Sequence, residues 1–65
     1  MRVLVKRSMP EKDGVKMFYY EMSASLDEVE ELPTTGVVGG SKCKITDAAS
    51  ATYYFDETSQ TWNVN

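Results

Sequence analysis

The chain has one cysteine and no histidine in 65 residues, which restricts how it can be stabilised. A lone cysteine cannot form an intrachain disulfide, and a metal site would need carboxylate and carbonyl ligands only. Domains this short bury only about 60% of the surface that the unfolded chain exposes, and they usually add disulfides, metals or partners. We therefore expect residues 1–65 to form a single small β-rich domain that depends on its core or on a partner.

Composition and charge indicate a folded, soluble protein of a reducing cytoplasm. A hydrophobic fraction of 42% argues against a disordered tail. No apolar run is long enough to span a membrane, and residues 1–7 become charged too early for a signal peptide. The net charge of −3 opposes long-range attraction to phosphate backbones. The charges are segregated, with most bases in residues 1–16 and only acids in residues 17–36.

The first third of the chain predicts two strands. Residues 1–8 begin with a β-branched run, and residues 15–22 are rich in aromatic side chains. Between them, residues 9–14 contain a proline and an Asp-Gly pair, which predict a loop or a long hairpin connection. The second segment has bulky side chains on both faces, so we expect it to be central or covered on its second face.

A change of period predicts one short helix at about residues 25–32. Ser25 and Glu28 have the spacing of a capping box. Leu26, Val29 and Leu32 fall on one stripe that should dock on the sheet. The proline at position 33 ends the element after about two turns.

Three strand candidates follow, at residues 42–46, 52–56 and 61–64, separated by turns of hairpin length. The predicted fold class is therefore α+β: a small, mainly antiparallel sheet in the order β-β-α-β-β-β, whose last three strands form a meander. We expect Trp62 to be the largest single contributor to the core.

The residues predict no catalytic, cofactor-binding or metal site, so the chain is not expected to be an enzyme and no cofactor is expected. Cys43 lies mid-strand beside Ile45 on one face, the pattern of an inert core residue. The acids of residues 27–31 occupy consecutive helical positions, which is typical of a solvated face and not of a calcium loop. The glycine-rich residues 36–42 lack the order of a phosphate-binding loop.

Aromatic side chains on the second face of the sheet should need cover. We predict a protein-interaction face formed by Phe18, Tyr20 and Tyr54, because aromatic residues dominate protein interfaces. The alternative is nucleic-acid binding by a small β-barrel, through basic residues of the N-terminal part interleaved with aromatics: Arg2, Lys6 and Lys16 near Phe18 and Tyr20.

Residues 31–62 resemble short proteins encoded among the head and tail genes of tailed bacteriophages. The resemblance is carried by Leu-Pro-Thr at 32–34, Gly-Ser-Lys-Cys at 40–43, Tyr-Tyr-Phe-Asp at 53–56 and Trp62. It implies a virion-associated or morphogenesis role for a phage or prophage protein. The partner would be a virion protein or a second copy, first in the cytoplasm of the producing bacterial cell and then in the virion. A regulator that binds a host protein is a further alternative, whereas a membrane or a small-molecule substrate is not expected.

Overall fold

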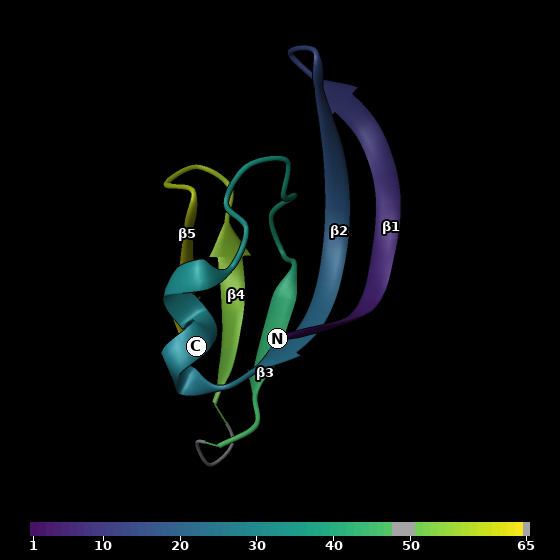
Figure 1. Cartoon of the computed structure of the whole chain (residues 1–65). Coiled ribbons are helices and arrows are strands. Elements are labelled where there is room, and N and C mark those ends of the chain that lie inside the picture. Colours follow the sequence, from purple (N-terminus) through teal and green to yellow (C-terminus); the bar gives the residue numbers. More distant parts are fainter. Residues whose placement is uncertain (48–50, 65) are drawn as a thin grey trace.

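The computed structural model describes residues 1–47 and 51–64, which form a five-stranded sheet and one short 3₁₀ helix (Figure 1). The strands are β1 (Arg2–Lys12), β2 (Val15–Ala24), β3 (Lys42–Ile45), β4 (Thr52–Asp56) and β5 (Thr61–Val64), and the helix is η1 (Leu26–Glu31). The described part is predominantly β, so the predicted class α+β overestimates the helical content. Six residues are too few for an α-helix that is stable without docking, and here they form the tighter 3₁₀ turn.

The strands lie in the sheet in chain order, β1-β2-β3-β4-β5. The expected C-terminal meander is confirmed, because β3, β4 and β5 pair as antiparallel neighbours. The sheet as a whole is mixed, since β2 and β3 run parallel. Parallel neighbours need a crossover connection, which η1 and residues 32–41 provide.

The first two strands form a hairpin that extends beyond the rest of the sheet (Figure 1). Its turn is the two-residue Asp13-Gly14, with both φ angles positive at 52° and 78°. The predicted loop over residues 9–14 is therefore mostly strand, because β1 continues to Lys12. Pro10 is tolerated there because β1 is an edge strand, where a missing N–H removes no essential ladder bond.

The start of η1 is fixed by side-chain contacts on both sides. Oε1 of Glu28 accepts hydrogen bonds from the Ser25 amide (2.9 Å) and hydroxyl (3.1 Å), so the predicted capping pair is in contact. The predicted docking stripe is only partly correct, since Leu32 is buried and Val29 half-buried but Leu26 is 51% exposed. The Leu26 amide donates to Asp47 (2.9 Å), which follows β3, so η1 begins past the end of that strand.

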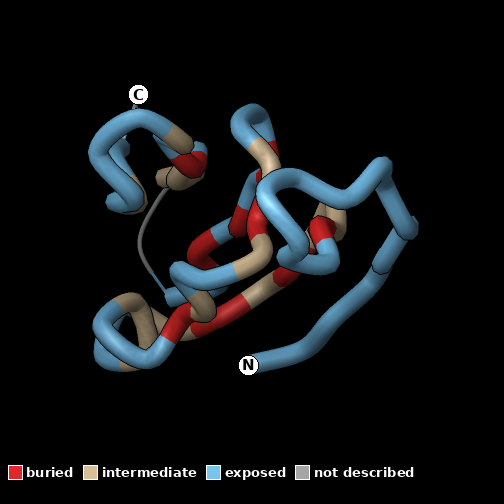
Figure 2. The backbone as a smooth tube through the Cα atoms, turned by 90° about the horizontal axis from the view of Figure 1, so that it is seen from above, coloured by how far each residue is buried: buried red, intermediate tan, exposed pale blue. Residues whose placement is uncertain are grey.

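The core lies between η1 and one face of the sheet. Its buried residues, joined by partly buried side chains that include Tyr53 and Trp62, are Met22, Ala24, Leu32, Cys43 and Ile45. The burial predicted for Cys43 is confirmed, with no exposed surface. Figure 2 shows the buried positions at the centre of the molecule, whereas β1 is exposed along nearly its whole length. The sheet face opposite η1 has no element packed on it among the described residues.

Candidate interaction surfaces

β1 is one of the two edge strands of the sheet, and it is the longer one. β1 pairs only with β2, so its other side offers unpaired amides and carbonyls. Among its side chains only Val5 is half-buried, and Val3 and Leu4 are 50% and 57% exposed. The edge also carries Arg2, Lys6 and Arg7, with no acidic residue before Glu11.

The three residues predicted as one interaction face lie on two faces. Phe18 and Tyr20 lie together on the side of the sheet that packs against η1, with ring centroids 6.2 Å apart. The Lys6 ammonium lies over both rings, 4.5 Å and 5.8 Å from their centroids. Tyr54 is 40% exposed on the opposite side, where it pairs in register with Lys42. Strand alternation separates them, because Tyr53 and not Tyr54 points into the core.

The sheet face opposite η1, which we call the open face, combines bases with tyrosines. Arg7 lies over the Tyr19 ring at 6.0 Å, and the Tyr19 hydroxyl donates to Glu21 (2.8 Å). This hydrogen bond is the main reason that the pKa of Tyr19 is raised. The Lys42 ammonium is 3.7 Å from the same carboxylate. Register pairing places Arg2 and Lys44 on this face as well, since both oppose Ser23.

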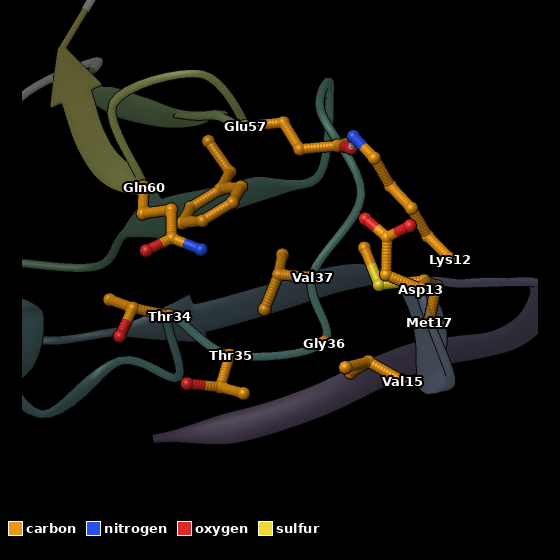
Figure 3. A pocket seen from close by; sticks show the side chains of 11 residues that line it. Lys12, Asp13, Val15, Met17, Thr34, Thr35, Gly36, Val37, Glu57 and Gln60 are labelled. Atoms are coloured by element: carbon orange, nitrogen blue, oxygen red, sulfur yellow. Dashed lines mark hydrogen bonds and ion pairs between the residues drawn. The ribbon is translucent and has the colours of Figure 1, made fainter.

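A hollow lies between the tip of the β1–β2 hairpin, residues 34–37 and the β4–β5 turn (Figure 3). One charged contact bridges it: the Lys12 ammonium donates to Glu57 (2.8 Å), whose other oxygen accepts from the Gly39 amide (2.9 Å). The Lys12 hydrogen bond lowers the pKa of Glu57, and the same bond raises the pKa of Lys12. This Lys12–Glu57 ion pair connects the tip of the β1–β2 hairpin to the β4–β5 turn, and we call it the clasp.

Burial and hydrogen bonding shift the pKa values of two side chains, Cys43 and Glu28, in opposite directions. Burial raises the pKa of the Cys43 thiol and disfavours the thiolate that a nucleophile requires. The N-terminal ammonium of Met1 and the Ser25 amide lower the pKa of Glu28 to about 2, so this carboxylate remains ionised. Within residues 1–47 and 51–64, no three carboxylate or thiol side chains are grouped so that they could hold a metal ion.

Two structural residues were missed by the sequence analysis. Ser41 is fully buried, accepts a hydrogen bond from the Tyr20 amide (3.1 Å) and donates to the Val38 carbonyl (2.9 Å). Glu57, in the β4–β5 turn, accepts hydrogen bonds from Lys12 and from the Gly39 amide. A serine or glutamate in a loop has no local pattern that reveals a partner far along the chain.

No protein-family model, curated protein or solved structure matches this chain. In the described residues, no helix has the length and apolar character needed to cross a membrane.

Proposed function

We propose that the chain is a non-enzymatic phage or prophage protein, virion-associated or used in morphogenesis, that acts through protein–protein contacts at the β1 edge. The observation that carries this proposal is the open, eleven-residue edge of β1 with its exposed apolar side chains. An exposed edge strand can accept a strand from another chain, with main-chain hydrogen bonds giving affinity and side chains giving specificity. The phage setting rests on the resemblance over residues 31–62.

The charge of the edge supports a protein partner with an acidic extended segment. β1 carries the bases Arg2, Lys6 and Arg7 and no acidic residue before Glu11, so the potential near this edge is positive. Single basic residues on an edge also discourage indiscriminate pairing between strands. A partner strand carrying acids and small apolar residues would meet both features.

The test is capture of a capsid or tail protein of the same particle by the immobilised chain, identified by mass spectrometry. Val3→Glu/Met9→Glu places negative charge on the β1 edge, where it repels an acidic partner strand, and should reduce recovery at least about tenfold. Val64→Glu is the control, because Val64 is 58% exposed on the other edge strand, β5. Equal recovery by both variants, or recovery of no particle protein by the parent chain, would contradict the proposal.

A further inference from the structure

The charges of the folded chain are unevenly distributed over the two sides of the sheet. The open face has more bases than acids: Arg2, Arg7, Lys42 and Lys44 against Glu21 and Asp56. On the side covered by η1, the exposed acids Asp27, Glu30 and Glu31 lie with Asp47, which contacts the Leu26 amide. Lys6 lies on that side as well, over the aromatic rings of β2, so the acidic region is the part around η1. The open face is therefore net basic, and the surface around η1 is net acidic.

The basic face contains a hollow of about 240 Å³ over β3 and β4. Leu4 and Tyr54 provide apolar surface in it, and Lys42 and Lys44 provide positive charges. Glu21 also lines the hollow, 3.7 Å from the Lys42 ammonium, so the hollow carries a net positive charge through Lys44. Leu4 is exposed at the irregular pairing between Val3 and Val5, so its side chain lacks cover within the described chain. The hollow thus suits an apolar side chain that is flanked by carboxylates.

The acidic side presents such a side chain. Leu26 is 51% exposed at the start of η1, although the periodicity places it on the docking stripe. Asp27 follows it directly, and Glu30 lies one turn further along. An exposed leucine between carboxylates on one side complements an apolar hollow with lysines on the other.

We propose that Leu26 and the acids of η1 of one copy dock on the Leu4–Lys42–Lys44–Tyr54 hollow of a second copy. The two surfaces differ, so the contact is head to tail. A pair of copies therefore still has one free hollow and one free η1 surface. Such a heterologous contact continues into a ring or a filament and does not stop at a dimer. Leu4 lies on β1, but the rest of the hollow lies on β2, β3 and β4, and the substitutions that test this contact leave β1 unchanged.

The contact can be tested by sedimentation equilibrium of the whole chain over a range of concentrations. At low ionic strength the average mass should rise past that of a dimer, and it should fall in about 1 M salt, where the screening length is roughly 3 Å. The hollow variant Lys42→Gln/Lys44→Gln and the η1 variant Leu26→Ser/Asp27→Asn/Glu30→Gln should each associate at least about tenfold more weakly. Lys16→Gln removes an exposed positive charge away from the hollow and should assemble like the parent.

Mixing the two deficient variants gives the sharpest result. The hollow variant retains an intact η1 surface, and the η1 variant retains an intact hollow, so an equimolar mixture should form heterodimers and nothing larger. All substituted side chains are exposed, and circular dichroism should show unchanged folds. The proposal would be overturned if the parent chain stays monomeric at about 1 mM and low salt. A symmetric dimer that neither variant weakens would overturn it as well, and so would an open face that binds only single-stranded DNA.

Discussion

At the scale of single residues, the stability of the fold depends on a glycine whose backbone conformation and surroundings leave no room for a side chain. Gly36 has a φ of +72°, and a Cβ atom there would lie 2.7 Å from the Lys16 carbonyl oxygen. The Gly36 carbonyl accepts a hydrogen bond from the Phe18 amide (2.8 Å). This hydrogen bond joins the crossover segment to β2 ahead of the parallel pairing of β2 with β3. The role of Gly36 is therefore both conformational and steric.

Gly36→Ala should lower the free energy of unfolding by more than the roughly 1–2 kcal/mol expected for a left-handed alanine alone. Gly14→Ala is the control, because its φ is also positive, at 78°, but an added Cβ would meet nothing within 4 Å. Urea denaturation of the two variants separates the clash from the conformational cost. Equal losses would mean that the loop moves away from β2 without penalty.

At the scale of elements, Trp62 links β5 to the segment that follows η1. Its indole N–H donates to the Pro33 carbonyl (2.9 Å), and its ring lies 5.2 Å from that of Phe55. It is only half-buried, so it attaches one element to another at the margin of the core cluster. Its expected rank as the largest single contributor to the core stays a prediction.

Trp62→Ala should cost about 3 kcal/mol, the lower end of the range for buried tryptophan, because part of the ring is already exposed. Trp62→Phe keeps most of the ring contact and should lose about 1 kcal/mol with the hydrogen bond to Pro33. Thermal unfolding followed by circular dichroism measures both. If Trp62→Ala melts like the parent chain, the ring belongs to a binding surface.

The elements also show which structural information is local in the sequence. The positions of β3, β4 and β5 followed from alternation and turn residues, and the Ser25–Glu28 spacing identified the start of η1. The parallel pairing of β2 with β3 and the Lys12–Glu57 clasp join residues distant in the sequence, so no local pattern predicts them. Strand alternation places Tyr54 on the opposite face from Phe18 and Tyr20, so the three do not form one surface, and their contact with a partner stays a prediction. Leu26 is exposed because η1 begins beyond the end of β3.

At the scale of the whole molecule, carboxylates with lowered pKa values tie distant parts of the chain together. Glu28 joins η1 to the N-terminus, and Glu57 joins the hairpin tip to the crossover. The pKa of Glu28 falls from 4.5 in the unfolded chain to about 2, and that of Glu57 is also lowered. Both contributions are therefore fully present above pH 4.5 and are lost as the pH falls toward the folded values.

The melting temperature should be nearly constant from about pH 5 to 8 and should decline below about pH 4.5. Glu28→Gln/Glu57→Gln should melt at a lower temperature near neutral pH and show a shallower acid decline. Scanning calorimetry across this range gives both curves. Parallel curves for parent and variant would assign the acid decline to other carboxylates.

The parallel pairing of β2 with β3 also has a consequence for how fast the chain folds. The β1–β2 hairpin closes over two residues and can form within microseconds, but a two-stranded hairpin is at best marginally stable alone. Joining β2 to β3 requires closure of the whole segment from η1 to Ser41, and this entropy is lost before the pairing is gained. We expect the rate-limiting barrier at this closure, so Gly36→Ala should act mainly by slowing refolding in stopped-flow experiments, with little change in the unfolding rate.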